Sequence, residues 1–161
     1  MKKSKSTRLQ TKRHPLALVA GFVVLLVGGY LIYNFIPKAD QTILRVEGGS
    51  AFTVEIADDN EERYQGLSGR DSLGEREGML FVYGASGQYQ FVMRGMRFAL
   101  DFVWIDSNKE IIAVTENVEP STYPGQSFSS SDPARYILEV NSGTVAREGW
   151  SIGDKVEFNV E

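Results

Sequence analysis

The chain has 161 residues, 42% of them hydrophobic, which predicts one packed domain with room for an additional segment. Its net charge of −4 hides a division: residues 1–14 carry six Lys or Arg and no acid, whereas residues 40–161 carry ten Lys or Arg against 21 Asp or Glu, a net charge of −11. The acidic body argues against nucleic acid as a partner, since phosphate binding requires a cationic face, and the lack of Cys excludes disulfides and thiolate chemistry.

The N-terminal part of the chain contains an apolar segment, residues 15–36, without a single charge. At about 1.5 Å per residue, a helix of this length crosses a hydrocarbon core of roughly 30 Å. We therefore expect residues 1–14 to form a cytoplasmic basic tail and residues 15–36 an uncleaved transmembrane anchor in the cell membrane, with the rest of the chain extracytoplasmic. The alternative is a cleaved signal peptide, but its apolar region runs about 7–15 residues, and the segment here is longer.

The rest of the chain predicts strands. Residues 37–50 are expected to be a linker and a first strand, followed by a β-sandwich domain at 51–161. Apolar and polar residues alternate at 51–57 and 155–160, the period-2 pattern of antiparallel strands with one wet face.

Three further stretches, residues 79–83, 100–105 and 110–114, are apolar on both faces. This pattern suits central strands of two sheets packed together. Turn signals rich in Gly, Ser, Pro and Asn separate the stretches. We expect a mainly β fold, a jelly-roll-like antiparallel β-sandwich or barrel of about eight strands.

Two short helices are predicted to interrupt the strands, at residues 58–67 and 142–150. The first has the acidic residues of a capping box, and each segment ends near a glycine. The expected caps are Asp58 or Asp59 and Gly66 for the first helix, and Ser142 and Gly149 for the second.

The sequence contains no strong catalytic signature. His14, the only histidine, lies in the basic tail, so the folded body has no histidine to act as a base or metal ligand. This excludes Ser-His-Asp catalysis and imidazole-based metal sites there. We therefore expect no catalytic residue of established type, no metal and no cofactor.

Charged residues within the apolar strands are the remaining candidates for a site. If residues 95–99 form a hairpin turn, Arg94 and Asp101 lie close enough to pair, and Arg135 and Glu139 share one face of another strand. One interpretation is a set of ion pairs at strand ends, each contributing about 0–1 kcal/mol. The other is a shallow binding pocket below loop aromatics. The candidate binding face then comprises Arg94, Asp101, Arg135, Glu139, Tyr123 and Phe128.

Several blocks occur in a characteristic order across residues 52–157. They are Glu62-Arg63, Gly66-Leu67, Arg70, Gly78-Met79-Leu80-Phe81, Leu100-Asp101, Arg135-Tyr136 with Glu139, and Gly153-Asp154. With these blocks the chain resembles the small bacterial and archaeal proteins of the domain of unknown function 192 family. The resemblance implies a jelly-roll-like β-sandwich and proteins that are often exported or anchored, but it implies no activity.

The chain departs from the family pattern most at residues 91–101. Positive charge is kept at Arg94 and a carboxylate at Asp101, whereas an amide and a hydroxyl are lost. The departures are Val92 for Trp, Arg94 for Lys, Gly95 for Asn, Met96 for Thr and Ala99 for Pro.

Two classes of function stay open. The first is a membrane-anchored extracytoplasmic binding module for a glycan or an envelope protein. The second is a hydrolase that acts on envelope glycans or polymers through the paired carboxylates of Asp101 and Glu139. A concave pocket that holds both carboxylates within acid/base reach would favour the hydrolase, and a convex face with both acids paired to arginines would favour the binding module.

Overall fold

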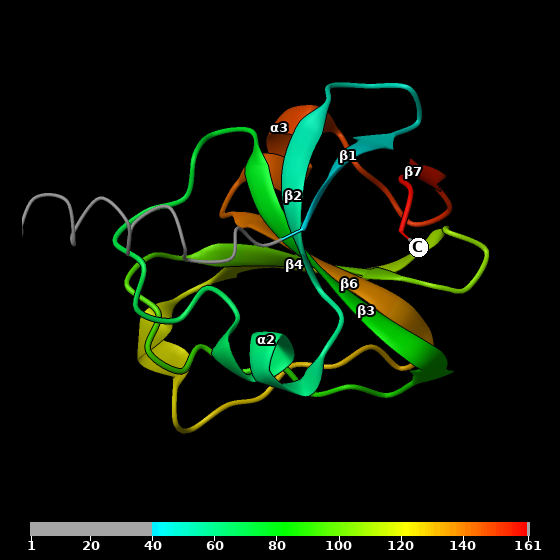
Figure 1. Cartoon of the computed structure of the whole chain (residues 1–161). Helices are drawn as coiled ribbons and strands as arrows, with labels where there is room; N and C mark the ends of the chain where they lie inside the picture. The colour runs from blue at the N-terminus through cyan, green and yellow to red at the C-terminus, as the bar shows by residue number, and fades with distance from the viewer. Residues whose placement is uncertain (1–39, 161) are drawn as a thin grey trace, which may run out of the picture. The chain divides into compact units, whose positions relative to one another are not determined.

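The computed structural model describes residues 40–160 (Figure 1). The expected basic tail and the expected anchor, residues 1–14 and 15–36, lie outside the described residues. Within residues 40–160, no helix has the length and apolar character needed to span a membrane.

Seven strands form one sheet in the order β5-β4-β6-β3-β2-β1-β7. The pair β2–β3 is parallel, and the other neighbouring strands are antiparallel. The strands are β1 (Gln41–Val46), β2 (Phe52–Ala57), β3 (Glu77–Gly87), β4 (Leu100–Ile105), β5 (Ile111–Val118), β6 (Ala134–Asn141) and β7 (Val156–Glu157).

The sheet curls until its two outermost strands come together (Figure 1). The residue before β5, Glu110, bridges Lys155 before β7. Beside this bridge the amide of Ile111 donates to the carbonyl of Asp154 at 3.0 Å. The mainly β prediction is confirmed, but the expected sandwich of two antiparallel sheets is wrong, because a single curled sheet with one parallel pair forms instead.

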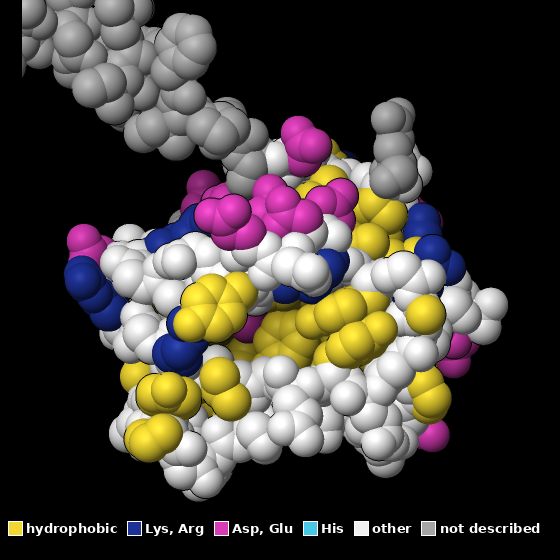
Figure 2. All heavy atoms as spheres, turned by 60° about the horizontal axis from the view of Figure 1, so that its bottom comes forward, with side chains coloured by type: hydrophobic (Ala, Val, Ile, Leu, Met, Phe, Trp, Pro, Cys, Tyr) yellow, Lys and Arg dark blue, Asp and Glu magenta, His cyan; other side chains and the backbone are white. Residues whose placement is uncertain are grey.

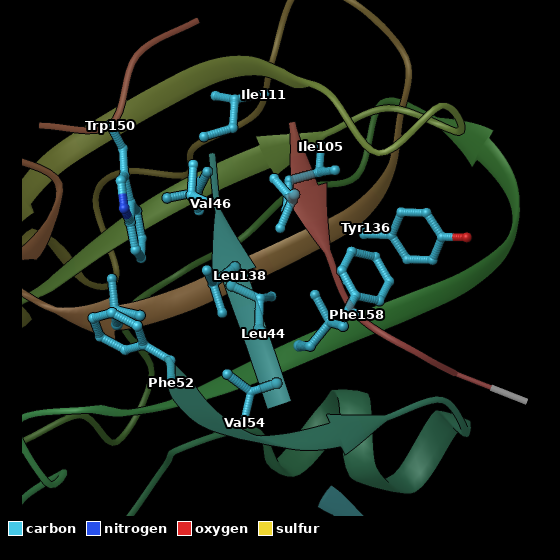
Figure 3. Packing of buried hydrophobic residues seen from close by; sticks show 14 of the residues in the cluster. Leu44, Val46, Phe52, Val54, Ile105, Ile111, Tyr136, Leu138, Trp150 and Phe158 are labelled. Carbon is cyan, nitrogen blue, oxygen red and sulfur yellow. The ribbon is translucent and has the colours of Figure 1, made fainter. Parts of the chain in front are cut away.

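The concave side of the curled sheet encloses the larger hydrophobic core (Figure 3). The rings of Phe52 and Trp150 meet edge to face at 5.2 Å, and those of Tyr136 and Phe158 at 4.9 Å. Burying one such side chain contributes about 1.5–3 kcal/mol. The labelled members in Figure 3 come from β1, β2, β4, β5, β6 and the C-terminal segment, so this core ties both ends of the sheet together.

The convex side of the sheet carries a second core, which helix α2 and three long loops cover. Phe81, Ile137 and Trp104 stand in register on β3, β6 and β4 and belong to this core. Strands with a core on each side must be apolar on both faces. This explains the doubly apolar pattern that had suggested two stacked sheets.

The caps of the two helices agree only in part with the prediction. Helix α2 (Asn60–Gln65) has the predicted capping box: the carboxylate of Asp59 accepts from the amide of Glu62 at 2.8 Å, and Gly66 ends the helix. Helix α3 (Thr144–Glu148) ends at Gly149 with φ 71°, as predicted.

A single 3-10 turn, η1 (Pro120–Thr122), follows β5.

The predicted N-cap of α3 is wrong, because Gly143 takes that position. The hydroxyl of Ser142 donates to the side chain of Asn117 at 2.6 Å instead. A first-turn amide of α3, that of Val145, donates to the carboxylate of Asp101 on β4 at 3.0 Å. A side chain from the sheet therefore replaces the local cap.

Candidate functional site: a hollow over Glu139

Strand register places a row of four side chains across the convex face of the sheet. Glu55 pairs with Met79, Met79 with Glu139, and Glu139 with Phe102, on β2, β3, β6 and β4. Side chains in register on neighbouring strands point to the same face. Glu139 therefore projects from the middle of the sheet toward the covering loops.

A hollow of about 240 Å³ opens over Glu139, between the end of α2 and residues 90–96. Figure 2 shows this face of the molecule, where a depression is lined mainly by hydrophobic side chains and has Lys or Arg side chains beside it. Its lining residues are Arg63, Tyr64, Gln65, Gly66, Leu67, Ser68, Phe81, Tyr83, Gln90, Phe91, Val92, Arg94, Met96 and Glu139.

The carboxyl group of Glu139 has no hydrogen-bond partner among residues 40–160, and although the residue is only 6% exposed, its oxygens are open to the hollow, because no fully buried side-chain oxygen in these residues lacks a partner. Burial raises the pKa of this carboxyl from 4.5 to about 8, and the positive charge of Arg70 opposes the change only weakly. Glu139 is therefore mainly a neutral acid at pH 7, able both to donate and to accept a hydrogen bond.

Arg70 is the cation that acts on Glu139, but its guanidinium is bound to another acid. Arg70 donates to both carboxylate oxygens of Glu55, at 2.5 and 2.8 Å. These hydrogen bonds lower the pKa of Glu55 and raise that of Arg70. Two acids of one row thus have opposite pKa changes, because, among the residues that the structure describes, Glu55 has a hydrogen-bonded partner and Glu139 has none.

One wall of the hollow is built from contacts between the end of α2 and the segment after Phe91. The guanidinium of Arg94 stacks on the ring of Tyr64 at 3.8 Å and donates to the carbonyl of Tyr64. The hydroxyl of Ser68 donates to the carbonyl of Arg94 at 2.7 Å. Gly95 has φ 66°, and a side chain there would press against Ser68, so the close approach requires glycine.

Another part of the lining contains Arg63 and Tyr83. Arg63 donates to the carbonyl of Val82 at 2.9 Å and to the side chain of Asn60 at 2.9 Å. Its guanidinium lies 5.1 Å from the centre of the Tyr83 ring. Burial raises the pKa of the Tyr83 hydroxyl. Arg63 thus fixes α2 to β3 and is largely committed to these bonds.

Asp101 lies on the other side of the sheet from Glu139. It stands in register with Val140, a member of the concave core, whereas Glu139 stands in register with Phe102 of the convex core. Its carboxylate accepts from the amides of Asn117 at 2.8 Å and Val145 at 3.0 Å. The predicted proximity of Asp101 to Glu139 in one pocket is therefore wrong.

The predicted ion pair of Arg94 with Asp101 is also wrong, since the two side chains bind different partners within residues 40–160. The expected strand before the turn does not form: Phe91 makes only an isolated bridge with Phe128. Without that hairpin, nothing brings Arg94 to the end of β4.

Arg135 does not pair with Glu139 in the described part of the chain. Four residues separate them on an extended strand, about 13 Å. Arg135 instead donates to the carbonyl of Tyr83 at 3.4 Å, and its guanidinium lies 5.6 Å from the Tyr136 ring. Alternation along the strand could not supply the distance between the two side chains.

Two aromatic residues of the expected face lie outside the lining of the hollow. Tyr123 is 42% exposed, and the ring of Phe128 packs on Phe102 at 5.8 Å within the convex core. Of the six predicted residues, the hollow therefore brings together Arg94 and Glu139. Residues 40–160 hold no cluster of three or more acidic or histidine side chains suited to a metal ion.

Comparison with known proteins assigns this chain to a family. Residues 42–158 match the model of the domain of unknown function 192 (DUF192) family, described as uncharacterized ACR. The chain belongs to the DUF192 family.

Relatives share this fold over nearly their whole length. A UPF0127 protein of Pyrococcus furiosus is 28% identical over 121 residues, which cover 73% of this chain and 97% of that protein. A Sinorhizobium meliloti crystal structure, described as a candidate transcription regulator, is 32% identical with a TM-score of 0.71, covering 75% of this chain and 95% of that one. A Novosphingobium aromaticivorans protein of unknown function is 28% identical with a TM-score of 0.70, covering 76% and 89%.

The hollow contains residues that sequence reasoning did not assign to a site, above all Arg63, Tyr64 and Tyr83. Arg63 belongs to one of the sequence blocks that carry the DUF192 resemblance, so the sequence offered a reason to consider it as a site residue. Three positions where the chain departs from the family pattern, Val92, Arg94 and Met96, also line the hollow.

Proposed function

We propose that this DUF192 protein is a ligand-binding module at the cell envelope, held in the membrane by residues 15–36, and that the hollow over Glu139 is its binding site. The observation that carries the binding site is the buried carboxyl of Glu139, which lines an open hollow and has no partner among the described residues. The residue is largely withdrawn from water while its carboxyl oxygens stay open to the hollow, so a ligand there can supply the hydrogen-bond partner that the described residues do not.

The membrane anchor rests on the sequence. The uncharged residues 15–36 follow six cationic residues and precede an acidic body, which suits an extracytoplasmic domain. Protease added to spheroplasts is expected to remove the body and leave residues 1–14 protected. Release of a shortened, soluble body into the medium would show a cleaved signal instead.

We prefer a ligand-binding function to the alternative of a hydrolase that uses Asp101 and Glu139 as its paired carboxyl groups. Glycoside hydrolysis requires two carboxyl groups about 5–9.5 Å apart that flank one bond, whereas these two project from opposite faces of the sheet. Gene regulation, which the description of the Sinorhizobium meliloti protein suggests, is not carried over either, because residues 40–161 carry a net charge of −11.

The binding site is tested by thermal unfolding of the full chain in detergent, followed by the fluorescence of Trp104 and Trp150. Envelope extracts and purified glycans are added to the wild type, to Arg94→Ala and to the matched control Tyr123→Ala, whose site lies outside the hollow. A ligand at 100 times its dissociation constant stabilises the wild type and the control by about 2.7 kcal/mol. Equal stabilisation of Arg94→Ala would place the binding elsewhere.

A further inference from the structure

We propose that the ligand of the hollow is a small zwitterion, such as a free amino acid, with its ammonium group on Glu139 and its carboxylate at Arg94 on the rim. This inference rests on the proposed function and names the chemical class of its ligand. Three properties of the hollow carry it: an acid without a partner on its floor, aromatic walls and arginine at its edge.

The floor of the hollow offers one site for a cation. Glu139 is the only acid among its lining residues, and no described residue donates a hydrogen bond to it. With a pKa of about 8, its carboxyl is ionised at pH 7 at a cost of about tenfold in affinity. A bound ammonium group offsets this cost, because a charge-assisted hydrogen bond in a site shielded from water is strong.

The walls suit the apolar body of an amino acid. Phe81 and Phe91 meet edge to face at 4.8 Å beside Glu139, and Tyr64 and Tyr83 complete the aromatic lining. These rings bury apolar side chains, whereas Arg94 already lies on the Tyr64 ring, and Arg63 and Tyr89 lie against the Tyr83 ring. The volume of about 240 Å³ limits the ligand to a small molecule.

The rim carries the opposite charge. Arg94 uses one donor on the carbonyl of Tyr64 and stacks on its ring, so further N–H donors of its guanidinium remain for a carboxylate. Arg63 adds positive charge but spends its donors on Asn60 and Val82. The acid below and the arginine above therefore match a molecule with two opposite charges.

Ligands of other classes fit less well. A neutral sugar needs many hydrogen-bond partners, but the amide of Gln65 already donates to the carbonyl of Ser68 at 2.9 Å, and the hydroxyl of Ser68 donates to Arg94. A simple anion would bind at Arg94 but leave Glu139 without a partner. A simple amine would satisfy Glu139 but leave the remaining donors of Arg94 unused.

Titration calorimetry of the full chain in detergent separates these classes. The probes are the twenty standard amino acids, with a matched series around leucine: isopentylamine without the carboxylate, 4-methylpentanoate without the amine, and 4-methylpentanol without either. We expect at least one amino acid to bind at about 10 mM or below, its matched amine to bind more weakly, and the matched acid and alcohol to bind at least about tenfold more weakly than the amino acid.

Two variants assign the charged ends of the ligand. Glu139→Gln keeps the shape of the side chain and should lose at least about tenfold in affinity for both the amino acid and its amine. Arg94→Gln should remove the advantage of the amino acid over the amine. Tyr123→Phe, outside the hollow, should bind as the wild type does.

Proton release gives an independent readout. An ammonium group that binds to Glu139 displaces its proton, so binding to the wild type at pH 7 should release close to one proton, seen as a difference in heat between phosphate and Tris buffers. The release should fall to about half a proton near pH 8, continue to fall as the pH rises further, and be absent in Glu139→Gln. The other charged and titratable groups that face Glu139 are Arg63, Arg70 and Arg94, with Tyr64 and Tyr83 in the walls.

The outcomes separate this inference from the proposed function. Failure of every standard amino acid to bind, binding of the alcohol as tight as that of the amino acid, or unchanged binding by Glu139→Gln overturns the zwitterion. If a glycan stabilises the wild type but not Arg94→Ala, the binding module stands with a different ligand. If neither screen yields a ligand, the proposed function falls with it.

Discussion

Asp101 and Glu139 are buried acids on neighbouring strands, yet they differ in the hydrogen-bond partners that each side of the sheet provides. On the concave side, Asp101 accepts from two backbone amides and thereby holds strand β5 at Asn117 and the first turn of α3. On the convex side, Glu139 lines a hollow and accepts from no described residue.

The comparison teaches that burial alone does not identify a site. A buried carboxylate that caps backbone amides stabilises the fold, because it satisfies donors that would otherwise be orphaned. A buried carboxyl without a partner opposes folding when ionised, and its presence points to an external ligand. The difference lies in the hydrogen-bond inventory of each group, and each of the following predictions tests one side of it.

The largest effect is expected in the pH dependence of stability at Glu139. Its folded pKa of about 8 exceeds the unfolded value of 4.5, so the folded state keeps a proton that the unfolded chain has lost. This stabilisation is complete below pH 4.5 and disappears as pH rises to about 8. Urea unfolding of the wild type should therefore lose about 5 kcal/mol between pH 4.5 and 9 relative to Glu139→Gln. Parallel profiles of the two proteins would refute the assignment.

Asp101→Ala should have the next largest effect. The substitution removes two charge-assisted hydrogen bonds and leaves the amides of Asn117 and Val145 without an acceptor. We expect a loss of about 3 kcal/mol in urea unfolding at pH 7. Asp101→Asn keeps one acceptor oxygen and should lose about half as much. A loss below about 0.5 kcal/mol in Asp101→Ala would contradict the structural role.

Glu55→Gln sharpens the comparison within the row. The substitution removes the carboxylate that binds Arg70, which is partly exposed, so we expect a loss of only about 1 kcal/mol at pH 7. The wild-type contribution should disappear on acidification, because Arg70 lowers the pKa of Glu55. Released from Glu55, Arg70 should also lower the pKa of Glu139, measured by the pH profile of stability. If the pH profile of stability due to Glu139 is unchanged in Glu55→Gln, the guanidinium of Arg70 does not move closer to Glu139.

Arg94→Ala should have the smallest effect. Its contacts with Tyr64 are exposed, so the loss is expected to be about 0.5 kcal/mol in urea unfolding. Because Arg94 and Asp101 share no contact, the double variant Arg94→Ala/Asp101→Ala should lose the sum of the two single losses. If the double variant is no less stable than Asp101→Ala, the two side chains interact, and this result would contradict the structure.

The sequence predicted those parts of the fold that depend on neighbouring residues. The capping box of Asp59 and Glu62 and the closing Gly149 were predicted correctly, because each involves only a few consecutive positions. Strand β4 was also predicted, but the parallel pairing of β2 with β3 was not. An apolar pattern shows that a strand has a buried face without naming its partner, and it cannot distinguish two sheets from one sheet with two cores.

The site could be predicted only in outline. Charges within apolar strands pointed to Glu139 and Arg94, and both line the hollow. The contribution of Arg63 depends on how α2 lies against β3, and the contribution of Arg70 depends on the pairing of β2 with β3. These are distances between elements far apart in the chain, which alternation and spacing do not encode.

The most direct test of the account is the titration of the Glu139 side-chain carboxyl by carbon-13 NMR, with its resonance assigned by its loss in Glu139→Gln. The account predicts a midpoint near pH 8 in the ligand-free protein, because burial without a partner disfavours the ionised form. A midpoint near the ordinary value of 4.5 would show that water or a protein group already stabilises the carboxylate, and would contradict the central claim.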